Sequence, residues 1–296
     1  MRILLIGNPI AGRGSARAAV DGLAARLLRR GHAVDVCWTE RPGHATALAA
    51  ARRDSADCVV SAGGDGTLRE VYAGLAAAAP ILPLPLGTGN MMSRELFVPA
   101  DPERQFDLIE SGAERRIDVG RVGGNPFLAV VGVGFDAMVT RAIGEERGEA
   151  LGFRGYLLPI LRAALRYRPP ALCVSVDDGA PIDCGFVVVT KVRRYGGIMR
   201  ISDTARLDSG ELEVCLVSPA SVPHLLLLGP MALTGTLRHA PGFEMRSARR
   251  VRIDVPDGHA PAPAEVDGDF LGPTPIEIAI EPGGARVVAP ALGALP

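Results

Sequence analysis

The sequence predicts two domains: an N-terminal α/β domain with a parallel sheet and three-layer packing, followed by a mainly antiparallel β-sandwich. Strand and helix patterns alternate through residues 1–118, which is typical of parallel crossovers. From 119 to 283, strand patterns follow one another with few helices between them, which favours antiparallel pairing. Three of the early strands also end in glycine-bearing turns, at the edge where open parallel sheets bind ligands.

The first half begins with a continuous apolar run at residues 3–6, as expected for a strand buried on both faces. Ser15 is a candidate N-cap for a helix that continues to about residue 30 and is closed by Gly31. The same strand–turn–helix unit then recurs. Its further members are strands at 33–38, 58–61 and 81–84, and helices at 44–53, 68–78 and from 91.

The second half has a different pattern. Helical segments are confined to about 136–168 and 219–237. Short runs rich in β-branched residues, bounded by turn residues, predict the strands of this half. These strands are 119–122, 127–133, 171–176, 186–190, 212–217, 251–255 and 275–280.

Composition excludes several classes of protein. Of the 296 residues, 48% are hydrophobic and 22% charged, which is the balance of a globular chain, and the net charge of −1 gives no indication of nucleic-acid binding. The five cysteines form no CxxC pair, so we expect neither a zinc site nor a disulfide framework, and a reducing cytoplasm is the simplest location. The apolar runs at 3–6 and 225–237 are too short to span a bilayer. Peripheral contact at the inner membrane face stays open.

One glycine-rich turn carries the strongest functional signal. Gly63-Gly64-Asp65-Gly66-Thr67 follows a strand and precedes a helix, so backbone amides and the positive helix end converge where an anion binds. Glycine lets a phosphate approach the main chain. A carboxylate is unusual in such a site, and Asp65 is a candidate to handle a metal ion or a hydroxyl proton. The purely structural alternative is a tight turn with Asp as a turn former.

Two further turns follow neighbouring strands. Gly87-Thr88-Gly89-Asn90 offers a hydroxyl at Thr88 and an amide at Asn90, and the loop from Asn8 to Gly14 follows the first strand. The sequence lacks the GxxxxGK[ST] pattern, and no GxGxxG opens the first helix, so neither a P-loop nor a dinucleotide fold has its signature. Phosphates would be held here without a P-loop lysine.

These motifs together resemble the catalytic domain of the diacylglycerol kinase family, which includes sphingosine kinases, ceramide kinases and bacterial lipid kinases. The resemblance extends over nearly the whole chain. It covers Asn8-Pro9, Thr39 with Gly43, the two glycine turns, Gly132-Val133-Gly134-Phe135-Asp136 and Val266-Asp267-Gly268-Asp269. It implies an ATP-dependent lipid kinase that uses Mg²⁺, with residues 284–296 returning to the first domain.

The resemblance also implies roles for individual residues. Asp269 is the implied general base, and Asp65 the carboxylate that positions the triphosphate with magnesium or activates the hydroxyl. Asp208 is a substitute metal ligand, because Ser209 stands where the family has an aspartate. The implied nucleotide-site residues are Asn8, Thr39, Gly63, Gly64, Asp65, Gly66, Thr67, Gly87, Thr88 and Asn90.

A second departure is that the late turn reads Asp267-Gly268-Asp269, whereas bacterial members have Asp-Gly-Glu. The shorter side chain at Asp269 leaves its reach to the substrate oxygen open. Two alternatives remain: a small-molecule kinase like the NAD kinases, which also use a GGDGT turn, and a nucleotide-binding regulatory module without transfer activity, for which Ser209 and the shorter Asp269 are the reasons. The expected partner is a lipid or lipid-like alcohol, whose identity and the oligomeric state the sequence does not define.

Overall fold

The structure is a computed structural model that describes residues 1–145 and 153–291. The chain divides into two compact units, one made of Met1–Val119 with the segment that starts at Pro282, the other of Gly120–Glu281. The predicted domains, 1–118 with 284–296 and 119–283, have nearly the same limits. Each unit is described below by itself.

The first unit is built on a parallel sheet of strand order β2-β1-β3-β4-β18. Its strands are β1 (Arg2–Gly7), β2 (Ala33–Trp38), β3 (Cys58–Gly63), β4 (Ile81–Pro85) and the last part of β18 (Ile276–Val288). Its helices are α1 (Ala16–Arg29), α2 (His44–Ala51), α3 (Asp65–Leu75), α4 (Met91–Glu95) and α5 (Pro102–Ser111), with a 3₁₀ turn at Ala11–Gly14.

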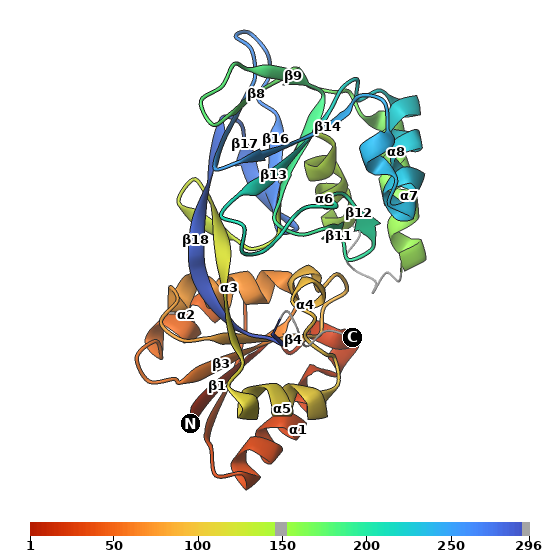
Figure 1. Ribbon diagram of the computed structural model, residues 1–296. Coiled ribbons are helices and arrows are strands. Elements are labelled where there is room, and N and C mark those ends of the chain that lie inside the picture. The colour runs from red at the N-terminus through yellow and green to blue at the C-terminus, as the bar shows by residue number, and fades with distance from the viewer. Residues whose placement is uncertain (146–152, 292–296) are drawn as a thin grey trace. The chain divides into compact units, whose positions relative to one another are not determined.

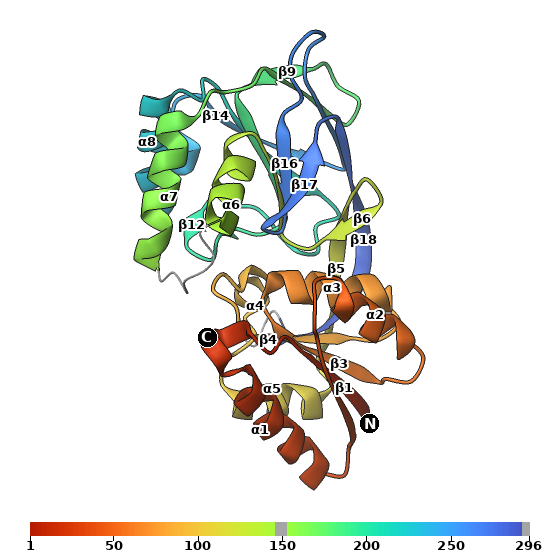
Figure 2. The same ribbon diagram turned by 180° about the vertical axis from the view of Figure 1, so that it is seen from behind.

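Figures 1 and 2 show the three layers of this unit: α2 and α3 cover one face of the sheet, and α1 and α5 cover the other. Strand β3 is buried along its whole length, as a strand covered on both faces must be. Helix α5 was not predicted. Its start has a local signal, because the Asp101 carboxylate accepts a hydrogen bond from the Glu103 amide (3.2 Å) and Pro102 is the first helical residue.

Helices α2 and α3 lie unusually close together. A Cβ on Gly74 of α3 would lie 2.3 Å from the Thr46 carbonyl oxygen of α2, so only glycine fits there. The Glu70 carboxylate of α3 accepts hydrogen bonds from the amides of Gly43 (2.8 Å) and Ala45 (3.2 Å), at the start of α2. This packing fixes α3, whose first residue belongs to the central glycine turn.

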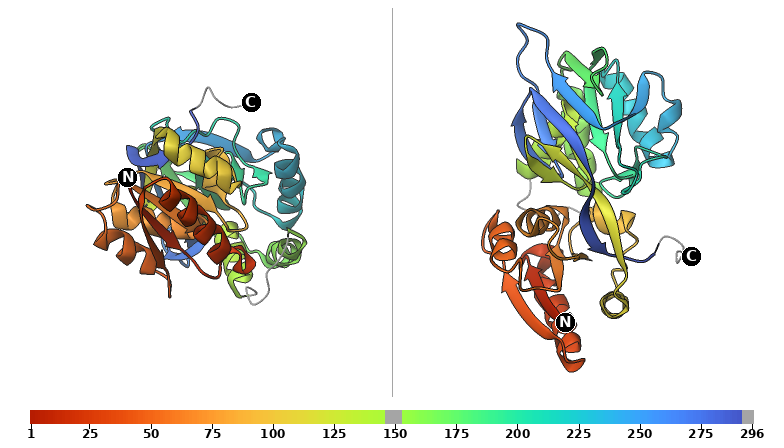
Figure 3. Two further views of the ribbon diagram at one scale, coloured as in Figure 1. Left: turned by 90° about the horizontal axis from the view of Figure 1, so that it is seen from below. Right: turned by 60° about the vertical axis from the view of Figure 1, so that its left-hand side comes forward.

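The end of the chain rejoins this unit through β18. Val287 of β18 pairs with Ile81 of β4 in parallel. The Tyr72 hydroxyl donates a hydrogen bond to the carbonyl oxygen of Gly284 (3.0 Å). Figure 3 shows β18 as the long blue strand beside the yellow β5 (Glu114–Val122), with which it pairs.

The second unit is a sandwich of two mainly antiparallel sheets. One sheet has the order β14-β13-β10-β7-β16-β17, and the other contains β18, β15, β8 and β9, with β5 beside β18 and β6 beside β5. The strands not yet bounded are β6 (Asn125–Phe127), β7 (Val130–Val133), β8 (Leu172–Val176), β9 (Ile182–Cys184), β10 (Phe186–Thr190), β13 (Leu212–Val217), β14 (Phe243–Ala248), β15 (Arg250–Asp254), β16 (Pro263–Val266) and β17 (Asp269–Pro273). A separate ribbon is formed by β11 (Arg194–Tyr195) and β12 (Met199–Arg200).

The core of the sandwich consists of alternating side chains from both sheets, among them Val131, Val189 and Ile253. Within the described part of this unit, three helices accompany the sandwich, α6 (Phe135–Glu145), α7 (Phe153–Arg166) and α8 (Val222–Thr234), together with a 3₁₀ turn at Leu237–His239. The predicted fold class is thus confirmed. The prediction of one strand over 127–133 was wrong in detail, because Leu128 and Ala129 separate β6 from β7, and the strand β16 that begins at Pro263 was not predicted. Strand β14 was not predicted.

Within the residues that the structure describes, no helix combines the length and the apolarity that crossing a membrane requires.

Candidate active site

Four loops of the first unit lie at one edge of its sheet, where β1 to β4 end. The Asn8 amide donates to the carbonyl oxygen of Ala62 (2.9 Å), the Leu86 amide to that of Gly63 (2.9 Å), and the Thr39 amide to that of Gly7 (2.9 Å). The nucleotide-site residues predicted from the sequence therefore gather along this single edge. Such an edge is the usual ligand-binding position in open parallel sheets.

The two central turns touch through glycines. A Cβ on Gly87 would lie 2.7 Å from the Cα of Gly64, closer than any side chain tolerates. A Cβ on Gly63 would lie 2.4 Å from the Thr67 hydroxyl oxygen. The glycines are therefore required to bring the main chains of the two turns into contact, and bare main chain at the start of a helix is a site suited to phosphate.

Asp65 joins the two turns. Its carboxylate accepts hydrogen bonds from the amides of Met91 and Met92, both at 3.0 Å, which are the first amides of α4. Burial raises the pKa of Asp65, and the hydrogen bonds from Met92 and Met91 oppose that rise. The sequence predicts a metal or proton site at Asp65. The structure gives the same carboxylate a structural partner as well.

The turn at 87–90 is closed by its own last residue. Asn90 has a φ of +46°; its side-chain oxygen accepts from the Gly87 amide (2.9 Å), and its Nδ2 donates to the Gly87 carbonyl oxygen (2.6 Å). The sequence predicts that the Asn90 side chain faces a nucleotide. In the structure this side chain forms hydrogen bonds within the turn itself. Thr88 is exposed at its tip.

The late acidic turn belongs to the second unit. Asp267 is buried, has a φ of +47°, and its carboxylate accepts hydrogen bonds from three successive amides. The three donors are Leu128 (2.8 Å), Ala129 (2.8 Å) and Val130 (2.9 Å). Asp269, two residues further on, is exposed at the start of β17. The turn therefore anchors one carboxylate and presents the other to solvent.

Two buried acids beside this turn were missed as a pair. Asp136 appeared in the sequence only as part of a glycine-containing string, and Glu265 carried no signal at all, because nothing local shows that the two side chains meet.

The structure adds no support for Asp208 as a metal ligand, and that assignment stays a prediction. The Arg206 Nε donates to the Asp208 carboxylate at 3.1 Å, and the Ser209 hydroxyl lies 3.2 Å from both the carbonyl oxygen and the amide of Glu211. Across residues 1–145 and 153–291, no three His, Cys, Asp or Glu side chains gather as a metal site. A magnesium ion delivered with a nucleotide needs fewer protein ligands, since phosphate oxygens and water complete its shell.

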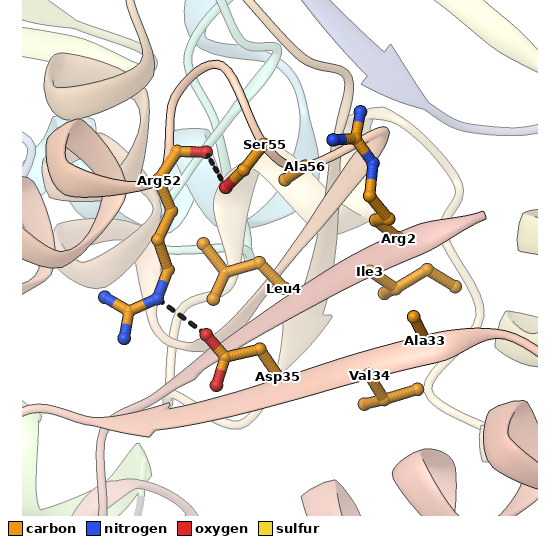
Figure 4. Close-up of a pocket in the computed structure, with 9 residues that line it drawn as sticks. All are labelled: Arg2, Ile3, Leu4, Ala33, Val34, Asp35, Arg52, Ser55 and Ala56. Atoms are coloured by element: carbon orange, nitrogen blue, oxygen red, sulfur yellow. Dashed lines mark hydrogen bonds and ion pairs between the residues drawn. The ribbon is translucent and has the colours of Figure 1, made fainter.

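A surface hollow of about 230 Å³ in the first unit does not coincide with these turns. It lies at the beginning of β1 and β2, whereas the glycine turns follow the ends of their strands, and the ion pair of Arg52 with Asp35 (2.6 Å) stands at its side (Figure 4). Its lining consists of Arg2, Ile3, Leu4, Ala33, Val34, Asp35, Arg52, Ser55 and Ala56.

Both units match known families. Residues 2–122 match the family described as diacylglycerol kinase catalytic domain, and residues 129–289 match the YegS C-terminal NAD kinase beta sandwich-like domain. A diacylglycerol kinase of Mycobacterium tuberculosis is 29% identical over 302 residues, which cover 99% of this chain and 96% of that protein. A diacylglycerol kinase of Bacillus subtilis is 27% identical over 283 residues, which cover 93% and 92% of the two chains.

A solved structure shows the same fold. A diacylglycerol kinase from Bacillus anthracis aligns with a TM-score of 0.76 at 20% identity, over 99% of this chain and 98% of that one. The family matches along both units are consistent with the structure, which has glycine turns at the sheet edge of the first unit and an acidic turn in the sandwich. Residues 2–122 therefore form a diacylglycerol kinase catalytic domain, and residues 129–289, more than half of the chain, belong to the YegS C-terminal NAD kinase beta sandwich-like family.

Proposed function

We propose that this protein transfers the γ-phosphate of ATP to a hydroxyl of diacylglycerol or a related lipid alcohol. The observation that carries the proposal is the contact between the turns at 63–67 and 87–90, where glycines expose main chain at the ends of two parallel strands. Phosphoryl transfer depends mainly on positioning and on neutralising charge, which such a site supplies.

The nucleotide would lie along the sheet edge of the first unit. Main-chain donors of the central turn and the start of α3 would bind its phosphates, with the Thr67 and Thr88 hydroxyls and the Asn8 and Thr39 loops beside them. Asp65 is the carboxylate in this region suited to an ion that accompanies the phosphates. Mg²⁺ would supply charge neutralisation between the β- and γ-phosphate oxygens.

The acceptor hydroxyl needs a base. Asp269 is exposed, its neighbour Asp267 is anchored, and it occupies the family position of the acidic residue after Gly268. We assign Asp269 to accept the proton of the attacking hydroxyl. General-base assistance of this kind contributes about 10²–10⁴-fold to a rate.

Two helices of the second unit support a lipid acceptor. Helices α7 and α8, side by side in Figures 1 and 2, contain no Asp or Glu. Among the side chains that the structure describes, the exposed leucines of these helices are Leu161, Leu165, Leu226, Leu227 and Leu233. Arg166 and Arg168 stand near the end of α7 and are exposed. Apolar side chains with cationic neighbours suit peripheral contact with an anionic membrane surface.

A direct assay tests the proposal. Purified protein is supplied with γ-labelled ATP and Mg²⁺, and with diacylglycerol, a sphingoid base, a glycolipid extract and NAD in parallel reactions. Label in a lipid product is the expected result. Label in NAD alone would favour the small-molecule kinase, and nucleotide binding without any labelled product would favour the regulatory module. Co-sedimentation with anionic and with neutral vesicles tests the membrane contact separately.

A further inference from the structure

The second unit contains two buried acids that the proposed reaction does not use. Asp136 is 7% exposed and lies in the first turn of α6; Glu265 is 0% exposed and lies in β16. Glu265 pairs with Gly132 of β7, and residues directly opposite on antiparallel strands point to the same face. A Cβ on Gly132 would lie 1.9 Å from Asp136 Oδ2. Because Gly132 has no side chain, the two acids can meet in the space that its Cβ would otherwise fill.

The two acids require a proton between them. The carboxyl groups of Asp136 and Glu265 lie within hydrogen-bonding range of each other, and two carboxyl groups form a hydrogen bond only when one of them is protonated. Asp136 Oδ2 and Glu265 Oε1 are buried oxygens with no N–H or O–H donor among the described residues. A single proton placed between these two atoms satisfies both of them.

The surroundings favour the protonated form. Burial raises the pKa of Glu265 well above its usual range, and the negative charges of Asp136 and Asp267 raise it further. Burial also raises the pKa of Asp136. The Tyr195 hydroxyl of β11 hydrogen-bonds Asp136, and Thr140 of α6 hydrogen-bonds Tyr195 in turn. Asp267 and Tyr195 are thus the titratable side chains outside the pair that act on it, and neither is a cation.

The acid pair is connected to the late acidic turn. Glu265 Oε2 accepts a hydrogen bond from the Gly268 amide at 2.8 Å. Gly268, with a φ of +87°, lies between the anchored Asp267 and the exposed Asp269. Three amides hold the Asp267 side of the turn, and Glu265 holds the amide next to Asp269.

We propose that Asp136 and Glu265 share one proton and act together as positioning residues for Asp269. Loss of that proton leaves two buried carboxylates that repel each other, and Glu265 then no longer holds the Gly268 amide in place. The role in positioning rests on the proposed function, in which Asp269 is the general base. The sharing of a proton does not depend on it.

The pair makes stability depend on pH in a defined direction. Because Glu265 binds its proton more tightly in the folded chain, the folded state carries more protons than the unfolded state above the ordinary glutamate pKa of about 4.3. The contribution of the pair is complete below that pH. It is lost as the pH rises through the raised pKa of the folded chain.

The variant Glu265→Gln tests the proposal, since glutamine donates an N–H to Asp136, accepts from Gly268 and has no proton to lose. The measurements are kcat and the urea midpoint of unfolding from about pH 6 to pH 10. In the unmodified protein both should fall toward alkaline pH, kcat by up to about 10²-fold because the base is misplaced. Glu265→Gln should abolish both losses or move them up by about one pH unit or more. Asp136→Asn, which donates to Glu265 instead, should do the same.

Glu213→Gln is the matched control, because Glu213 is a half-buried glutamate of the same sheet with a raised pKa from burial, held by Thr204 and Ser247. The kcat of Glu213→Gln should still fall toward alkaline pH, as it does in the unmodified protein. The proposal is overturned if Glu265→Gln superimposes on the unmodified protein in both measurements, or if the midpoint responds and kcat does not. If the protein shows no kinase activity but its urea midpoint responds as described, the shared proton is supported and the proposed function is refuted.

Discussion

The turns at 63–67 and 267–269 follow the same rule in different units. Each contains an aspartate directly before a glycine, and in each the carboxylate of that aspartate accepts hydrogen bonds from main-chain amides. Asp65 binds two amides at the start of α4, and Asp267 binds three amides that lead into β7. The Asp-Gly pairs of these two turns therefore organise backbone first, whatever chemistry they also support.

The difference between the turns separates two chemical tasks. Beyond Asp65, the first turn offers only glycines and Thr67, so main-chain donors dominate it. The second turn adds Asp269, an exposed carboxylate with an anchored neighbour. The first turn suits the binding of anionic phosphates, and the second suits the acceptance of a proton.

Replacing Asp269 tests the second task and has the largest expected effect. Asp269→Asn should lower kcat by about 10²–10⁴-fold because the base is lost. The free energy of unfolding should change by less than about 0.5 kcal/mol, since the side chain is exposed. Steady-state kinetics and urea unfolding provide the two values. Asp269→Glu, which restores a carboxylate of the family length, should retain activity; equal losses in both variants would contradict a role as base.

Replacing Asp267 should destabilise the folded protein and not only lower its activity. Asp267→Ala leaves three buried amides without an acceptor, which costs about 3–5 kcal/mol in the free energy of unfolding. Urea denaturation checks this value. Asp178→Ala, at an exposed aspartate of the same unit, is the control and should change stability by less than about 1 kcal/mol. Similar losses in the two variants would remove the distinction between anchored and presented carboxylates.

Asp65 is expected to show both kinds of effect at once. Asp65→Asn turns an amide donor toward a backbone N–H, which should cost about 1–3 kcal/mol of unfolding free energy. The turnover number should also fall by about 10²-fold if the carboxylate takes part in the reaction. Asp101→Asn, at the N-cap of α5, is the control and should be neutral within about 0.5 kcal/mol. Near-normal kcat in Asp65→Asn would leave Asp65 only its structural role.

The smallest effects concern the glycines. Gly87→Ala should destabilise by about 1–3 kcal/mol and raise the KM for ATP, because its Cβ collides with the main chain of Gly64. Gly22→Ala, in the interior of α1 with nothing within 4 Å of the new Cβ, should stabilise by about 0.5–1 kcal/mol. Thermal unfolding and ATP titration distinguish the two. A harmless Gly87→Ala would show that the turns need not touch.

Much of the fold follows from local patterns, because strands buried on both faces and amphipathic helices have distinct periodicities. Strands β1 to β4 were predicted for this reason, as was the change to antiparallel strands near residue 118. Helix α5 was missed although Asp101-Pro102 is a sound start signal. Strand β16 was missed because Pro263 and its neighbours read as a loop, whereas β7 and β17 on either side supply its pairing.

The sequence by itself determined the positions of the glycine turns and of the acidic turn, since strand ends, glycines and carboxylates are visible in the chain. Only the tertiary structure decided what each carboxylate does. Asp267 meets its amides across 137–139 residues of sequence, and Glu265 meets Asp136 because β16 pairs with β7 in one particular register. A buried carboxylate takes its protonation and its role from the donors that surround it, and long-range pairing brings those donors together.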